Sequence, residues 1–429
     1  MQFYSLNNQS IKDSFKEAVI QGIASDKGLF FPEEINPLPK EFWDSIEEFS
    51  DEEIAFELIN PFVDHIEPQK LKTIIKETLS FDFPVVPIEK GIYSLELFHG
   101  PTMAFKDVGA RFMARCLQHF NTDNENHVTV LVATSGDTGG AVANGFLGVK
   151  GVDVVILYPK GKVSDIQEKQ LTTLGNNIKA LEVNGVFDDC QDMVKTAFLD
   201  KEITDNMQLT SANSINVARW LPQMFYFALA YKKLKPQEKE VVFSVPSGNF
   251  GNICAGFMAQ KLGMPIKTMI AATNANDVVP HYLQTGEYQI KKSVATISNA
   301  MDVGNPSNFI RIQSLFNNNF KSLKNHLKSF RFTDYQTREA IKEIYSENNY
   351  ICDPHGAIGY LGLKEFSLNE TQLGVFLETA HPIKFIDTVA PLLNVEIAVP
   401  PQIKQVLGKD KTSIEINNYN DLKKALLND

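Results

Sequence analysis

Hydrophobic and polar positions divide the chain into a short first part with helical spacing and a longer part in which strands alternate with helices. In the first part, apolar residues recur at helical spacing over 11–23, and the stretches 44–60 and 70–79 are also amphipathic. We therefore predict a helical N-terminal segment, residues 1–83, that contains no strands and contributes no site residues.

From residue 84 onward, short runs rich in β-branched residues alternate with helical stretches. Strands are predicted at 127–133, 152–158, 178–183, 240–245, 266–272 and 373–377, and helices at 107–120, 140–146, 189–199 and 253–262. Such alternation is typical of βαβ units, which build a parallel sheet with helices on both faces. The polar run 232–239 predicts a boundary between two α/β domains, 84–235 and 236–429. Binding loops are then expected at the carboxyl ends of the strands.

Composition and charge exclude several classes of function. The 429 residues are 43% hydrophobic and 22% charged, as in globular proteins of this length, and the formal net charge is -11. Without a basic block, this charge argues against binding to nucleic acid or to an anionic membrane surface. No apolar run reaches transmembrane length, and residues 1–10 do not resemble a signal peptide.

The four cysteines predict the compartment and argue against a metal site. They are far apart and form no CxxC pair, and no two histidines have the spacing of metal ligands. We therefore expect reduced thiols, a cytoplasmic location and no bound metal.

Lys106 is the first candidate for chemistry. It follows Ala104 and Phe105 and stands at the start of the helix predicted over 107–120. Apolar surroundings and a helix N-terminus both disfavour the ammonium form. A neutral lysine amine is a nucleophile that forms a Schiff base with a carbonyl cofactor. Taken alone, however, the same pattern also describes a surface lysine beside a helix start.

Three loops that follow predicted strands offer polar contacts to a ligand. The loop 134–140, Thr-Ser-Gly-Asp-Thr-Gly-Gly, combines glycines, hydroxyls and a helix start, a combination suited to a carboxylate or phosphate. Its spacing fits neither the dinucleotide fingerprint nor the P-loop. The loop 244–252 has the same character, and Thr379 at the end of a third strand can present a hydroxyl to a ring nitrogen. Each loop alone is equally an ordinary turn between a strand and a helix.

Two other polar segments, 211–219 and 299–308, are either surface loops or substrate-facing loops. Arg111 and Arg115 lie four residues apart on one helix face, for which a solvated face is the simpler interpretation. His381 is interpreted as a hydrogen-bonded structural histidine.

Taken together, these segments resemble the threonine synthase family, pyridoxal-phosphate enzymes with the tryptophan synthase β-like fold (fold type II). The resemblance spans nearly the whole chain, and the order and number of the motifs make it specific. The motifs lie at 3–5, 26–33, 99–107, 135–139, 213–216, 248–252, 305–308 and 379–382.

The resemblance implies a role for each matching residue. Lys106 is the Schiff-base lysine, and Thr379 is the partner of the pyridine nitrogen. Asp137 stands where many relatives of this fold type carry Asn against the phenolic oxygen of the cofactor, and its role is left open. The cofactor phosphate is expected on Gly248, Asn249, Phe250, Gly251 and Asn252; the substrate is expected on Ser135, Gly136, Thr138, Asn213, Arg219 and Asn308, with Arg111 and Lys384 as further candidates for its phosphate.

The implied reaction is the conversion of O-phospho-L-homoserine and water to L-threonine and phosphate, in a monomer or homodimer with no extra effector site. A phospho-lyase of the same fold type that releases a 2-oxo acid has the same cofactor residues and remains an alternative. A non-catalytic protein that binds pyridoxal phosphate or an amino acid is a second alternative, although the intact Lys106 and the full set of loops argue against it. A nucleotide-binding module is disfavoured because the standard spacings are absent.

Overall fold

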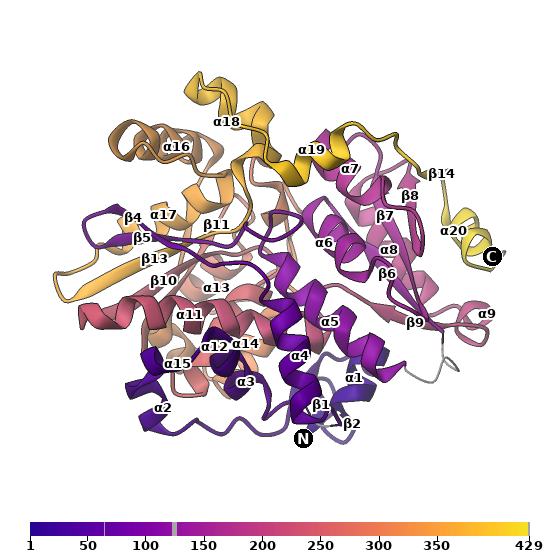
Figure 1. The fold of residues 1–429 in the computed structure, drawn as a ribbon, viewed down its shortest axis with the longest axis horizontal. Helices are drawn as coiled ribbons and strands as arrows, with labels where there is room; N and C mark the ends of the chain where they lie inside the picture. The colour runs from indigo at the N-terminus through magenta and orange to yellow at the C-terminus, as the bar shows by residue number, and fades with distance from the viewer. Residues whose placement is uncertain (64, 122–126, 428–429) are drawn as a thin grey trace.

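The computed structural model describes residues 1–63, 65–121 and 127–427. Within these residues, two larger sheets and one small sheet organise the molecule (Figure 1). The larger sheets have the strand orders β12-β11-β10-β13-β5-β4 and β14-β8-β7-β6-β9, and the small sheet has the order β2-β1-β3. The α/β architecture with two parallel-sheet domains is therefore confirmed.

The six-stranded sheet is parallel except at one edge. Its parallel strands are β10 (Glu240–Pro246), β11 (Ile266–Thr273), β12 (Leu327–Arg331), β13 (Gln372–Glu378) and β5 (Ile92–Glu96), while β4 (Val85–Glu89) runs antiparallel to β5. Every residue of β13 and all but the first of β10 are buried. Strands covered on both faces read as continuous apolar runs, which is why the strands predicted at 240–245, 266–272 and 373–377 are confirmed.

The five-stranded sheet is parallel throughout. It contains β6 (Val128–Ala133), β7 (Val152–Pro159), β8 (Ile178–Val183), β9 (Gln208–Ser211) and β14 (Ile414–Ile416). The strands predicted at 127–133, 152–158 and 178–183 are confirmed.

Helices connect the strands and cover the sheets. The α-helices are α1 (Phe15–Gln21), α2 (Lys40–Asp44), α3 (Asp51–Ile59), α4 (Pro68–Thr78), α5 (Lys106–Phe120), α6 (Asp137–Phe146), α7 (Asp165–Thr172), α8 (Phe187–Ala197), α9 (Lys201–Thr204), α10 (Val217–Trp220), α11 (Met224–Leu234), α12 (Gly251–Lys261), α13 (Val278–Thr285), α14 (Phe309–Leu315), α15 (Phe320–His326), α16 (Asp334–Asn348), α17 (Pro354–Phe366), α18 (Ile386–Leu393), α19 (Pro401–Leu407) and α20 (Tyr419–Leu427). Short 3-10 helices are η1 (Ile46–Glu48), η2 (Leu221–Gln223), η3 (Lys235–Gln237), η4 (Asn299–Met301) and η5 (Pro382–Phe385). Among the described helices, none has the length and apolar character needed to cross a membrane.

The prediction of an N-terminal segment without strands is wrong. This segment contains the small antiparallel sheet of β1 (Gln2–Ser5), β2 (Lys12–Ser14) and β3 (Phe30–Pro32). Its strands are three or four residues long, too short for an alternating pattern to be visible. The helix predicted over 11–23 is also shorter, because Lys12–Ser14 pair with β1 and the Ser14 side chain then caps α1.

The two larger sheets are not made from the continuous ranges 84–235 and 236–429 that the sequence predicts. The hairpin of β4 and β5 precedes Lys106 but joins the six-stranded sheet beside β13. Near the other end of the chain, β14 returns to pair with β8 (Figure 1). The chain therefore passes several times between the two sheets, and Lys106 lies just after one of these passages.

Candidate active site

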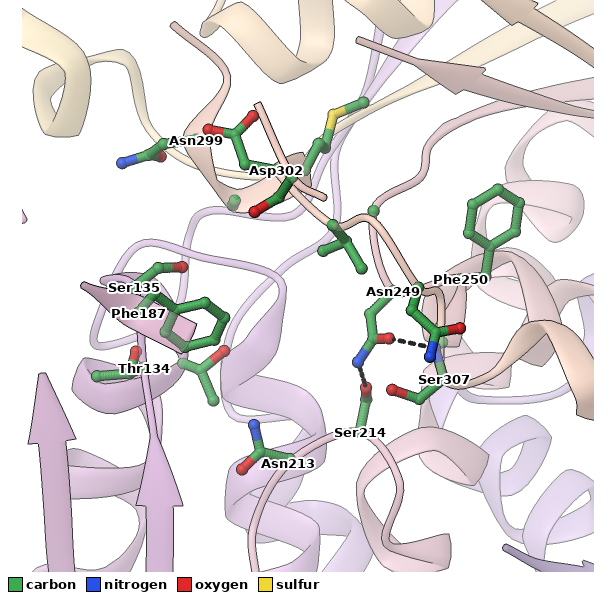
Figure 2. A pocket seen from close by; sticks show the side chains of 18 of the residues that line it. Thr134, Ser135, Phe187, Asn213, Ser214, Asn249, Phe250, Asn299, Asp302 and Ser307 are labelled. Carbon is green, nitrogen blue, oxygen red and sulfur yellow. Dashed lines mark hydrogen bonds between the residues drawn. The ribbon is translucent and has the colours of Figure 1, made fainter. Parts of the chain in front are cut away.

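The loops at the carboxyl ends of β6, β9, β10 and β13 surround one cavity of about 360 Å³, a volume typical of small-molecule sites. Figure 2 shows Ser135 and Asn249 on opposite sides of this cavity, with Asn213 below them. The predicted site residues that line it are Lys106, Ser135, Thr138, Asn213, Arg219, Gly248, Asn249, Phe250, Gly251, Asn252 and Thr379. Gly136, Asp137 and Asn308 are not among the lining residues.

Lys106 and Thr379 are held together by the backbone. The Phe105 N–H donates to the Thr379 carbonyl oxygen at 2.9 Å, and Ala104 pairs with Ala380 in an antiparallel bridge. Burial, reinforced by the charges of Lys384 and Arg219 and opposed by that of Asp137, lowers the pKa of Lys106 to about 8. In the unliganded chain, roughly a tenth of the Lys106 amines are then neutral at pH 7.

Asp137 and Lys384 form a buried ion pair behind this lysine. The Asp137 Oδ1 lies 2.7 Å from the Lys384 Nζ, and both side chains are nearly inaccessible. Gln167 donates to the same oxygen at 3.0 Å, and Lys384 also donates to the Thr102 carbonyl at 2.8 Å. Although burial alone would raise it, the charges of Lys384 and Lys106 and these hydrogen bonds lower the pKa of Asp137. Asp137 is therefore an ionised carboxylate. Lys384 pairs with Asp137 and does not line the cavity.

The turn before α6 requires glycine at Gly136. Its φ of 142° is rarely adopted by other residues, and a Cβ there would lie 2.6 Å from the Gln167 amide group. The Thr134 hydroxyl accepts from the N–H groups of Gly136 and Gly139 at 3.0 and 2.8 Å. This leaves the side chains of Ser135 and Thr138 on the cavity wall, while Gly136 shapes the turn.

The loop 248–252 is built around its backbone. Phe250 adopts φ 61°, and a Cβ at Gly248 would lie 2.7 Å from the Met301 Cα. The Asn249 side chain accepts from the Ser307 N–H at 2.7 Å and donates to the Ser214 hydroxyl at 3.0 Å (Figure 2). Among the described residues, the N-cap Phe250 makes no side-chain hydrogen bond to the start of α12, and the Asn252 side chain accepts from the Ile253 N–H at 2.9 Å. The helix start thus faces the cavity and is suited to an anionic group.

Arg219 is the cationic candidate that lines the cavity. It is 3% exposed, and its Nε and Nη1 have no hydrogen-bond partner among the described residues. Burial lowers the pKa of this guanidinium to about 10, and the charge of Asp107 opposes that shift. A buried guanidinium with unused donors is costly unless an anion occupies the site.

The other candidates for the substrate phosphate lie elsewhere. Arg111 donates to the Glu77 carbonyl at 2.6 Å and to the Ser80 hydroxyl at 3.0 Å. The Asn308 amide donates to the Ser214 hydroxyl at 3.1 Å and accepts from Arg311 at 2.7 Å. Through these contacts, Asn308 helps to hold the loop 213–219 in place and does not line the cavity. His381 is outside the cavity lining as well: its Nδ1 accepts from the Ile383 N–H at 3.1 Å, as in the structural histidine that we expected.

Sequence reasoning missed Arg311, which organises one side of the site. It is fully buried, stacks on Trp220 at 4.6 Å, and donates to the carbonyls of Phe30 and Ile215 at 2.9 and 2.6 Å. An arginine in an amphipathic helix is normally expected on the solvated face, so the sequence does not predict this buried, structural role of Arg311. Ser307, whose N–H donates to Asn249, lies in the polar loop 299–308, for which the sequence left a surface loop and a substrate-facing loop as alternatives.

The chain is similar to known proteins over its whole length. The family model described as pyridoxal-phosphate dependent enzyme matches residues 85–376, and the model described as threonine synthase N terminus matches residues 2–79. The threonine synthase of Buchnera aphidicola subsp. Acyrthosiphon pisum is 44% identical, with 100% of each chain covered.

Solved structures give the same result. The crystal structure of threonine synthase from Escherichia coli superimposes with a TM-score of 0.94 at 39% identity, covering 100% of both chains. The structure of PLP-bound threonine synthase from Brucella melitensis superimposes with a TM-score of 0.92 at 32% identity, covering 99% of this chain and 98% of the other.

Proposed function

The chain belongs to the threonine synthase family of pyridoxal-phosphate-dependent enzymes, and we propose that it converts O-phospho-L-homoserine and water to L-threonine and phosphate. The observation that carries the proposal is the cavity itself. It combines a partly neutral lysine, Lys106, with a buried arginine, Arg219, whose Nε and Nη1 have no hydrogen-bond partner among the described residues.

The residues present fit pyridoxal phosphate. The start of α12 and the backbone of Gly248–Asn252 suit its phosphate group, and the Thr379 hydroxyl suits its ring nitrogen. Lys106 lies beside Thr379 and suits its aldehyde. When bound, this cofactor withdraws electrons from the substrate carbons next to the amino group.

Lys106 moves the protons. With a pKa of about 8, its Nζ accepts a proton from the substrate Cα near neutral pH and delivers one to carbon later in the reaction. Asp137 faces the same lysine as a fixed negative charge, because Lys384 and Gln167 hold it ionised. Because Asp137 does not line the cavity, we assign to it the role of a fixed charge near Lys106 and no contact with the cofactor.

Two anion sites orient the substrate. The side chains of Ser135 and Thr138 hold its carboxylate, in a turn kept open by Gly136. Arg219 and Asn213 hold its phosphate, which leaves as an anion and remains hydrogen-bonded to the guanidinium. The burial of Arg219 strengthens this attraction, because little water screens it.

Product identification tests the proposal. The purified protein is incubated with pyridoxal phosphate and O-phospho-L-homoserine, and the products are identified by NMR. We expect threonine and phosphate in equal amounts, and no turnover by the Lys106→Ala variant. Phosphate with 2-oxobutyrate would instead identify a phospho-lyase. A visible cofactor band without any product would support the proposed cofactor site and refute O-phospho-L-homoserine as the substrate.

A second experiment addresses the phosphate site. The Arg219→Gln variant is expected to raise the KM for O-phospho-L-homoserine more than tenfold and to abolish competitive inhibition by inorganic phosphate. Arg115→Gln is the matched control, because Arg115 pairs with Glu77 outside the cavity. An Arg219→Gln variant with unchanged KM and unchanged phosphate inhibition would place the phosphate elsewhere.

The cytoplasmic location and the monomeric or homodimeric state stay predictions. The four cysteines are buried in the structure, and their reduced state also stays a prediction.

A further inference from the structure

His355 is a cavity residue that the sequence analysis did not select. It lies in the first turn of α17, and Asp353 is the N-cap of that helix. Its side chain is 2% exposed and lines the same cavity as Lys106 and Thr379. A histidine at this position is therefore close to the proposed chemistry without having an assigned role.

Asp353 fixes the orientation of the His355 ring. The Asp353 Oδ1 lies 2.5 Å from the His355 Nδ1 and also accepts from the His355 backbone N–H at 2.6 Å. The Phe385 ring packs edge-on against the imidazole, with 4.9 Å between the ring centroids. The Nδ1 is thus committed, and the ring has one orientation.

Asp353 is in turn anchored on both sides of Thr379. Its backbone N–H donates to the Glu378 Oε1 at 2.5 Å, and its Oδ2 accepts from the Ala380 N–H at 3.3 Å. Burial and the charge of Asp353 raise the pKa of Glu378 well above its ordinary value, so Glu378 carries a proton. Asp353 thus faces the imidazole with its Oδ1 and the Ala380 N–H with its Oδ2.

The remaining ring nitrogen is unused. The His355 Nε2 is buried and has no hydrogen-bond partner among the described residues. A buried polar atom without a partner is unfavourable and is rare in folded proteins. Because Nδ1 is committed to Asp353, Nε2 is the one polar atom of the ring that is still available to a ligand in the cavity.

We propose that the Asp353–His355 pair belongs to the cofactor site, in which Asp353 orients the ring and the His355 Nε2 forms a hydrogen bond with bound pyridoxal phosphate on the side of Thr379. The inference rests on the proposed function, since it requires this cofactor in this cavity. His355 is then a cofactor-contact residue, and Asp353 is a positioning residue.

Cofactor binding tests the role of His355. Full-length protein freed of cofactor is titrated with pyridoxal 5'-phosphate, and the Kd and the visible spectrum are measured. We expect His355→Leu to raise the Kd at least tenfold and to shift the visible band. His355→Gln, whose amide can reach the Nε2 position, should stay within about threefold. His326→Leu is the control, because His326 bonds the Ser322 carbonyl outside the cavity.

The wild-type protein supplies a readout that does not depend on a variant folding. With ¹⁵N-labelled histidine, the His355 Nε2 resonance, identified by its loss in His355→Gln, should shift when pyridoxal 5'-phosphate is added. Asp353→Asn should change the tautomer balance of His355 in the same spectra, an effect that a purely structural carboxylate would not produce.

Two results would overturn the inference: a folded His355→Leu variant with wild-type Kd and spectrum, or an Nε2 resonance that does not move on cofactor binding. Either result would leave the proposed function standing, provided that the wild type binds pyridoxal 5'-phosphate through Lys106. Failure of the wild type to bind it would instead refute both proposals.

Discussion

Removal of the Lys106 amine should stabilise the cofactor-free protein. Burial lowers the pKa of this lysine from 10.5 in an unfolded chain to about 8. At 1.36 kcal/mol per pKa unit, keeping it protonated in the folded protein at pH 7 costs about 3 kcal/mol. The Lys106→Met variant has no such cost, since methionine fills the same space without a charge. We therefore expect it to be about 3 kcal/mol more stable than cofactor-free wild type at pH 7.

The pH dependence has a definite sign. Below pH 8 the lysine is protonated in both states, so the full difference between the two proteins is present. Between about pH 8 and 10.5 the unfolded chain binds more protons than the folded one, so wild-type stability rises relative to the variant. The gap should shrink to about 1 kcal/mol by pH 10.

Urea unfolding of both cofactor-free proteins at several pH values measures this gap. Lys70→Met, at an exposed position of α4, is the control and should show no such pH-dependent gain. Addition of pyridoxal phosphate should reverse the order, because only wild type can bond the cofactor. A Met variant that is no more stable than wild type, or a gap that stays constant up to pH 10, would refute the reasoning.

Three further predictions address the surroundings of the site. Lys384→Met leaves Asp137 buried without its ion-pair partner and should lower the free energy of unfolding in urea by about 3–5 kcal/mol. Adding Asp137→Leu should recover part of that stability. A double variant that is no more stable than Lys384→Met would argue against the ion pair. Gly109→Ala places a Cβ 2.3 Å from the Arg219 carbonyl oxygen, so both the melting temperature and the affinity for inorganic phosphate should fall. Gly408→Ala is the control: a Cβ there has no neighbouring atom within 4 Å, so neither quantity should change. Thr379→Val should fold normally but shift the visible band of the bound cofactor; an unchanged band and rate would reduce Thr379 to a packing residue.

The sequence predicted those parts of the fold whose cause is local. Apart from their exposed first residues, His127 and Glu240, the runs at 127–133 and 240–245 are buried, so a continuous apolar stretch is enough to identify them. Edge strands lack this signal. Strand β14 and the three strands of the small sheet are only three or four residues long, and β14 pairs with β8, which lies far earlier in the chain. Their pairing is set by tertiary packing, which a local pattern does not record.

The candidate site shows the same division. Lys106, Thr379 and the loop 248–252 became candidates because glycines, hydroxyls and a helix start stand together in the sequence, but that pattern also fits ordinary turns, and only the resemblance to a family gave these residues their expected roles. Arg311 and His355 were missed because burial, not residue type, makes each of them notable. The ion pair of Lys384 with Asp137 was missed as well, since the two residues are far apart in the sequence.

The passage of the hairpin β4–β5 into the later sheet has a consequence for synthesis on the ribosome. This hairpin emerges early, but its neighbour β13 begins at Gln372. At roughly 5–20 residues per second, the β5 edge waits tens of seconds for its partner. During that interval its unpaired N–H and C=O groups can pair with another nascent chain. The order of translation therefore leaves the β5 edge open to such pairing until β13 has emerged.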